Sequence, residues 1–155
     1  MPERCVLGNY IHVGCDSVFL AQGGIRVDDG VIFGPRCTIW TANHRYDSAT
    51  AIPYDAGVVL RPVHVEEGVW VGTNALILPG VRVGYGSVIG AGSVVAGDIP
   101  PGAIAVGNPC RPVKFRDLAQ FDRLRKEQRW YLKLAGEGRL REEEIGLDLL
   151  EQELR

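Results

Sequence analysis

Aliphatic residues recur at every sixth position along the middle of this chain. The series holds through seven repeats without a slip: Val59, Val65, Val71, Ile77, Val83, Ile89 and Val95. A second series, four positions after each aliphatic residue, is also small or aliphatic: Val63, Val69, Ala75, Val81, Ser87 and Ser93. Because side chains alternate between the faces of a strand, a strict period of six predicts short strands, each followed by a turn. Three such sides close one coil, and stacked coils form a parallel β-helix.

The repeat is looser toward the N-terminus. There the phase runs through Leu7, Val13 and Phe19 and, after a slip of two residues, through Val27, Phe33 and Ile39. We expect the extra residues to bulge out near 23–26. Between Ile39 and Val59 the pattern fails, which predicts an external loop at about 45–58 that begins at His44. Loops on a rigid scaffold usually carry function.

The last part of the chain has a different composition. Residues 115–155 hold 9 Lys or Arg and 10 Asp or Glu, against 8 and 9 in the first 114 residues, and all nine prolines precede this stretch. The apolar residues that recur here at helical spacing are Phe115, Leu118, Phe121 and Leu124, then Trp130, Tyr131 and Leu134. Glycines at 136 and 138 interrupt the pattern, and a second, acidic helix is expected at about 140–154. The sequence thus predicts a β-helix domain over 1–114 and an α-helical extension over 115–155.

Composition narrows the classes of function. A chain of 155 residues with 17 basic and 19 acidic side chains fits one domain, and it has no basic field for nucleic acid or an anionic membrane surface. The N-terminus has no long apolar run, so we expect no signal peptide or membrane span and a cytoplasmic location. The four cysteines form no CxxC pair and show no regular spacing, which predicts reduced thiols and no metal.

Four ordered segments, at 69–84, 88–95, 98–101 and 107–111, resemble the hexapeptide-repeat acyltransferases. The resemblance covers about residues 7–114 and is closest to the maltose, galactoside and colanic-acid O-acetyltransferase branch. It implies a left-handed parallel β-helix that assembles as a homotrimer, with active sites between neighbouring subunits. It also implies that acetyl-CoA is the donor, bound along the cleft between two β-helices.

Acetyl transfer to a hydroxyl requires a base that removes the hydroxyl proton. Histidine, with an ordinary pKa near 6.5, suits this role. His44 stands where the external loop begins, which is where the family places its catalytic histidine. The branch often has proline after this histidine, whereas this chain has Arg45. Candidate contacts to the acceptor in and beside the loop are Asn43, Tyr46, Asp47, Tyr54 and Asp55.

The donor site implied by the resemblance lies on the coils themselves. Trp70 follows an inward valine and so points outward, and the family uses the matching tryptophan beside the pantetheine arm and the acceptor pocket. The other candidate contacts to acetyl-CoA are Gly72, Thr73 and Ala91 for the pantetheine, and Arg111 and Lys114 for the phosphates.

The leading interpretation is an acetyl-CoA-dependent O-acetyltransferase that acts directly on a sugar, polysaccharide-precursor or glycolipid-precursor hydroxyl, with His44 as general base. Transfer to the amine of an amino sugar or antibiotic is an alternative, since the same base serves both nucleophiles. A non-catalytic trimeric scaffold is a second alternative, because fold does not imply activity. A zinc carbonic anhydrase is disfavoured because His12, His44 and His64 lie 20 or more residues apart. The acceptor, the acyl chain length and the role of the C-terminal helices stay open.

Overall fold

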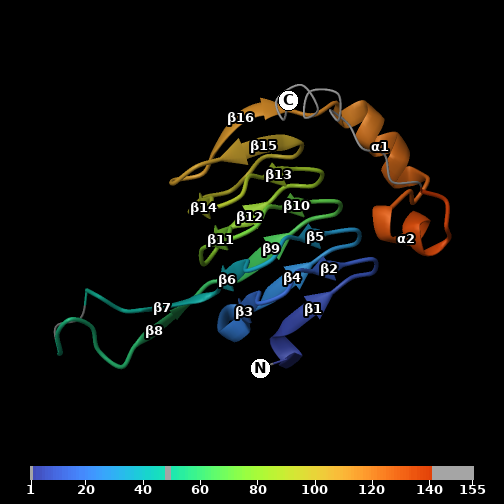
Figure 1. Cartoon of the computed structure of the whole chain (residues 1–155). Coiled ribbons are helices and arrows are strands. Elements are labelled where there is room, and N and C mark those ends of the chain that lie inside the picture. Colours follow the sequence, from blue (N-terminus) through green and yellow to red (C-terminus); the bar gives the residue numbers. More distant parts are fainter. Residues whose placement is uncertain (1, 48–49, 141–155) are drawn as a thin grey trace, which may run out of the picture.

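The computed structural model describes residues 2–47 and 50–140, which form stacked short strands flanked by a hairpin and two helices (Figure 1). Sheet A consists of β1 (Cys5–Leu7), β4 (Ile25–Val27), β9 (Val63–Val65) and β12 (Arg82–Val83). Sheet B consists of β2 (His12–Val13), β5 (Ile32–Phe33), β10 (Trp70–Val71), β13 (Val88–Ile89), β15 (Ala103–Val106) and β16 (Arg111–Phe115). Sheet C consists of β3 (Val18–Leu20), β6 (Thr38–Trp40), β11 (Leu76–Ile77) and β14 (Val94–Val95). The hairpin is β7 (Ala42–His44) with β8 (Val58–Leu60), the helices are α1 (Leu118–Lys126) and α2 (Tyr131–Gly136), and 3-10 turns span Pro2–Arg4 and Ala21–Gly23.

The chain visits sheets A, B and C in turn, so it winds as a three-sided coil. Within these sheets every strand pair is parallel except β15 with β16. In the upper coils the register is one full turn, since Trp70 pairs with Val88, three sixfold repeats further along the chain. The predicted parallel coils and their period are confirmed.

The predicted inward positions form the core from the second coil upward. Val65, Val71, Val83, Ile89 and Val95 all have exposed fractions of 0%. Ser87 and Ser93 of the second series are buried as well. The first coil is more open, with Leu7 at 50% and Val13 at 41% exposed, because its strands pair with a neighbour on one side alone in the described residues.

Val59 is the exception, and the prediction that it opens the inward series is wrong. It lies on β8, opposite Asn43 in the hairpin, and is 39% exposed. Its sixfold spacing from Val65 matches the coils, but the chain rejoins them only at Val63. The slip upstream is taken up slightly before its expected place, in the 3-10 turn Ala21–Gly23 and at Gly24, whose φ is 99°.

The C-terminal part folds back over the coils. Strand β16 runs antiparallel to β15 and crosses the predicted boundary at 114/115. Asp117 caps α1 by accepting from the backbone N–H groups of Ala119 (2.9 Å) and Gln120 (3.2 Å). The helix expected at about 140–154 lies outside the described residues except for its first position. No helix in the described part is long and apolar enough to cross a bilayer.

Helices α1 and α2 pack on the corner between sheets A and B, across the coil from the hairpin (Figure 1). This corner carries a column of glycines with positive φ: Gly30, Gly68, Gly86 and Gly102. A Cβ at Gly30 would lie 2.4 Å from the Trp130 ring, and one at Gly102 would lie 2.6 Å from Leu118. The glycines therefore allow both the turn and the close approach of the helices.

Candidate functional site

The β7–β8 hairpin leaves the coil at the corner between sheets C and A. Its arms are antiparallel, with His44 opposite Val58, and the Arg45 N–H donates to the Gly57 carbonyl oxygen at 3.0 Å. The tip points away from the coils (Figure 1). The predicted external loop is therefore present, and its first arm carries the predicted base.

His44 is held at the end of β7. Its backbone N–H donates to Asn43 Oδ1 at 2.9 Å, and its ring stacks on Tyr54 with centroids 3.8 Å apart and planes 16° from parallel. Stacking occupies a face of the imidazole and leaves both nitrogens at the ring edge. The stack therefore fixes the plane of the imidazole ring.

Arg45 and Asp55 join the two sides of the hairpin. Their side chains form an ion pair in which the Asp55 side chain is 8% exposed and the Arg45 side chain 53%. Asp55 Oδ1 also accepts from the Gly57 N–H at 2.7 Å. Asp55 thus contacts the hairpin itself and does not line the cavity beside His44. Arg45 of this pair is the residue after His44, for which the resemblance leads one to expect a proline.

A cavity of about 410 Å³ lies beside His44. The hairpin contributes the predicted residues Asn43, Tyr46 and Asp47, while Leu78, Pro79 and Ala96 come from the corner between sheets C and A in the upper coils. Sequence reasoning missed these last three. The signal was present in the period, because Leu78 and Ala96 are one full coil apart at the corner where the hairpin leaves.

The remaining predicted residues lie on the other side of sheet C. Trp70 is on the outer face of sheet B and is 57% exposed. Gly72, Thr73 and Ala91 form the corner between sheets B and C. Gly72 and Ala91 are stacked so closely that a Cβ on Gly72 would lie 2.6 Å from the Ala91 nitrogen. Exposed Arg111 and Lys114 sit on β16 at the upper end of sheet B.

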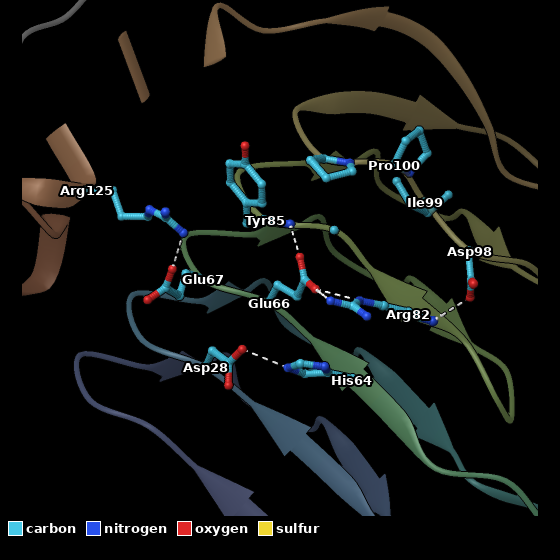
Figure 2. A pocket seen from close by; sticks show the side chains of 12 residues that line it. Asp28, His64, Glu66, Glu67, Arg82, Tyr85, Asp98, Ile99, Pro100 and Arg125 are labelled. Atoms are coloured by element: carbon cyan, nitrogen blue, oxygen red, sulfur yellow. Dashed lines mark hydrogen bonds and ion pairs between the residues drawn. The ribbon is translucent and has the colours of Figure 1, made fainter. Parts of the chain in front are cut away.

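A second cavity, of about 660 Å³, lies on sheet A and contains none of the predicted site residues (Figure 2). Most of its charged side chains pair with one another, while Asp98 accepts from the Arg82 backbone N–H at 2.7 Å. His64 Nε2 lies 2.7 Å from Asp28 Oδ2, Arg125 Nη1 lies 2.6 Å from Glu67 Oε2, and Arg82 pairs with Glu66. These pairs stabilise the sheet and connect α1 to it. Because these charged groups are already paired within the protein, they are not free to bind a charged ligand.

Asp28 has a shifted pKa. Partial burial by itself raises the pKa of this carboxyl, but hydrogen bonds from Arg26 and His64 outweigh burial and hold the pKa below its ordinary value. Arg26 Nε and His64 Nε2 lie 2.8 Å and 2.7 Å from the two carboxylate oxygens. Asp28 therefore links side chains of two neighbouring strands, Arg26 on β4 and His64 on β9.

The cysteines and the potential metal ligands form no cluster of their own. Within 2–47 and 50–140 no three His, Cys, Asp or Glu side chains are arranged to hold a metal ion. All four cysteines are free thiols, and burial raises the pKa of Cys37 and Cys110 above the ordinary value. A raised pKa lowers the thiolate population and so favours a structural role for these two.

Known proteins share the repeats and the fold of this chain. The family model for bacterial transferase hexapeptide repeats (six repeats) matches residues 62–97. The galactoside O-acetyltransferase of Lactococcus lactis is 36% identical over 122 residues, which are 77% of this chain and 58% of that protein. The crystal structure of a maltose O-acetyltransferase from Clostridium difficile is 38% identical with a TM-score of 0.69, over 74% of this chain and 60% of that one.

A second solved structure contains the donor. A hexapeptide-repeat acetyltransferase from Vibrio cholerae, crystallised with acetyl-CoA, is 30% identical with a TM-score of 0.69, over 74% of this chain and 62% of that one. The chain thus spans less than two thirds of the length of these three relatives.

Proposed function

Because the chain belongs to the hexapeptide-repeat acyltransferase superfamily, we propose that it transfers the acetyl group of acetyl-CoA to a hydroxyl of a sugar, or of a polysaccharide or glycolipid precursor. The observation that carries the proposal is His44, stacked on Tyr54 beside a cavity with polar hairpin walls. Relatives named for galactoside and maltose O-acetylation support the acceptor class, and the relative crystallised with acetyl-CoA supports the donor. The reaction is assigned to the cytoplasm.

In the proposed mechanism His44 is the general base. The imidazole takes the proton of the acceptor hydroxyl as the oxygen attacks the thioester carbonyl carbon. A C–O bond forms, the C–S bond breaks, and the proton passes from the imidazole to the departing thiolate. Asn43, Tyr46 and Asp47 are placed to hydrogen-bond acceptor hydroxyls. Transfer is direct, so no acyl group is attached to the protein.

The proposed donor site follows the corner between sheets B and C. The stacked backbone groups at Gly72, Thr73 and Ala91 form a narrow edge that suits the amide-bearing pantetheine arm. Arg111 and Lys114 are exposed cations at the upper end of sheet B, and they suit the CoA phosphates. Trp70 stands on the adjoining face.

The donor residues and His44 lie on opposite edges of sheet C, so a complete site requires a second copy of the chain. The outer face of sheet C is apolar, with exposed fractions of 48% for Val18, 38% for Leu20 and 45% for Trp40. We propose that this face forms the interface of a homotrimer. The donor edge of one subunit then meets the His44 corner of the next. The resemblance and the solved relatives also support the left-handed winding of the coils.

The proposed function is tested by acetyl transfer to panels of oligosaccharides and amino sugars. We expect His44→Ala to lower turnover about 10²- to 10⁴-fold, the range for loss of a general base. His12→Ala is the matched control, because His12 is an exposed histidine on the first coil and should leave turnover unchanged. Turnover with amines alone would contradict O-transfer. No transfer to any acceptor by the wild-type chain would favour the scaffold interpretation.

The proposed trimer is tested by light scattering after size exclusion. Trp40→Glu buries a charge in the sheet C interface and should yield monomers that lack activity. Val6→Glu, on the exposed outer face of sheet A, should remain trimeric. Mixing inactive His44→Ala chains with inactive Ala91→Trp chains should restore part of the activity, because some mixed sites combine an intact His44 with an intact Ala91. A trimeric and active Trp40→Glu variant would overturn this interface.

A further inference from the structure

A groove of about 430 Å³ lies between the outer face of sheet B and helices α1 and α2. Its floor is a row of apolar side chains placed side by side by the strand register: Ile32, Trp70, Val88 and Ile104. The helices supply the facing wall through Phe121, Leu124 and Tyr131. The groove is therefore apolar along its length, and Tyr131 and Trp70 are both more than half exposed within it.

The helical wall is fixed to the coils. Trp130 is 8% exposed and packs on Gly30. On the sheet A side, Arg125 pairs with Glu67 and lies over the Tyr85 ring at 5.0 Å, as the left part of Figure 2 shows for the ion pair. These contacts attach α1 and the start of α2 to the coils. The wall of the groove formed by the helices is therefore held in place by packing and by an ion pair.

Positive charge is concentrated at this groove. Three arginines line it, and Arg125 is the one neutralised by a carboxylate. Arg116 donates to the Gly86 carbonyl oxygen at 2.9 Å and lies 5.4 Å from the Phe121 ring centroid. Across 2–47 and 50–140, neither Arg116 nor Arg129 takes part in an ion pair. An apolar floor beside two guanidinium groups that have no carboxylate partner among the described residues suits a ligand that joins an apolar chain to an anion.

We propose that this groove binds the part of the acceptor remote from the reacting hydroxyl, and that this part is an apolar chain linked through phosphate. The inference rests on the proposed function, because Trp70 both lines the groove and adjoins the proposed donor edge. In the proposed trimer His44 of the neighbouring subunit meets that edge. The acceptor class is then an amphiphilic sugar phosphate, in which the sugar lies at Trp70 and the chain lies under α1 and α2.

Direct binding tests the groove without catalysis. Decyl phosphate, below its critical micelle concentration, is titrated into the full chain by calorimetry, with inorganic phosphate as the chain-free comparison. We expect saturable binding of decyl phosphate, weakened about tenfold by Arg129→Gln, as for loss of a charge-assisted hydrogen bond. Arg123→Gln is the matched control, because Arg123 is exposed on α1 but does not line the groove. Equal affinities for wild type and Arg129→Gln, or no binding, would overturn the proposal.

Kinetics separate this proposal from the proposed function. With an alkyl-phosphate-linked sugar as acceptor, Arg129→Gln should raise KM about tenfold and leave kcat unchanged, while KM for a free sugar should not change. Acetyl transfer with no such difference overturns the groove and leaves the proposed function standing. Decyl phosphate binding without any acetyl transfer overturns the proposed function, and with it the acceptor role of the groove, but leaves the groove as a binding site for alkyl phosphates. Cosedimentation with phosphatidic acid vesicles distinguishes a membrane lipid from a soluble alkyl phosphate. A change of oligomeric state in Arg129→Gln would identify a subunit interface and overturn the proposal.

Discussion

The coils and the β7–β8 hairpin are stabilised in different ways. In the coils each inward side chain packs between its counterparts from the turns below and above, and most are 0–3% exposed. The hairpin tip has no such stack, with Tyr46 83% and Ile52 94% exposed. Among its described side-chain contacts are the Arg45–Asp55 ion pair and the His44–Tyr54 stack, and neither belongs to a repeat. Packing between repeats therefore stabilises the coils, whereas the proposed chemistry lies in the hairpin, where the repeat is absent.

The largest difference in stability is expected between two valines that occupy the same position of the six-residue repeat. Val83 is 0% exposed in the core and Val59 is 39% exposed in the hairpin. We expect Val83→Ala to lower the free energy of unfolding by about 2 kcal/mol, because it removes buried methyl groups and leaves a cavity. Val59→Ala should cost less than about 0.5 kcal/mol.

Chemical denaturation of both variants at one protein concentration measures this contrast. The concentration must be matched because assembly adds to apparent stability. Equal losses in the two variants would mean that the hairpin is as tightly packed as the coils.

A smaller effect is expected at the ion pair of the hairpin. Arg45→Ala leaves the Asp55 carboxylate, 8% exposed, without its guanidinium partner. We expect the arms to loosen at a cost of about 1 kcal/mol, and turnover to fall about fivefold as His44 loses its fixed position. Limited proteolysis in the hairpin and steady-state kinetics measure the two effects. A double-mutant cycle with Asp55→Asn gives the coupling energy, and a coupling near zero would refute the link.

The stack on His44 should matter slightly less. Tyr54→Ala removes an aromatic contact worth about 0.5–1.5 kcal/mol, so turnover should fall about threefold. Tyr54→Phe keeps the ring and is expected to retain turnover. The ratio of the two variants, measured as kcat with saturating donor, isolates the stacking from the hydroxyl. If Phe and Ala lower kcat equally, the tyrosine hydroxyl matters and the stack does not.

The same contrast explains what could be predicted from the sequence. Coil positions such as Ile77 and Ile89 are predictable because each environment recurs once in every coil, so a spacing carries the contact. The pairing of Arg45 with Asp55 has no repeat and depends on the path of one hairpin. Spacing alone does not prove burial: Val59 keeps the sixfold spacing of the core residues but lies outside the core. The loss of the pattern between Ile39 and Val59 predicted the external segment, and the structure has the β7–β8 hairpin there, with His44 on its first arm. The sheet B groove was missed because it depends on helices outside the repeats.

The smallest predicted effect concerns charges on the outside of the coils, and it follows the pKa of Asp28. This carboxyl has a folded-state pKa below its ordinary value, because hydrogen bonds from Arg26 and His64 outweigh burial. Its contribution to stability is therefore present above the unfolded pKa, near 3.8, and is lost as pH falls through the folded pKa. Asp28→Asn should cost roughly 1 kcal/mol or less at pH 7, since Arg26 is 66% exposed and screened by water.

As pH falls below 3.8 the stability difference between the two proteins should shrink, and they converge only below the folded-state pKa of Asp28, where the carboxyl is protonated in the folded and the unfolded chain alike. Glu127→Gln, which removes a carboxylate at an exposed residue after α1, is the comparison variant. Denaturation series from pH 3 to pH 7 measure both. If the loss of stability caused by Asp28→Asn instead increased as pH falls, the predicted pH dependence would be wrong. Burial, which raises the pKa of Asp28, would then outweigh the hydrogen bonds from Arg26 and His64, which lower it. In that case Asp28 would add no charge-based stability to the outside of the coils, and it would differ more clearly from Asp55 of the hairpin, whose side chain is 8% exposed in its ion pair.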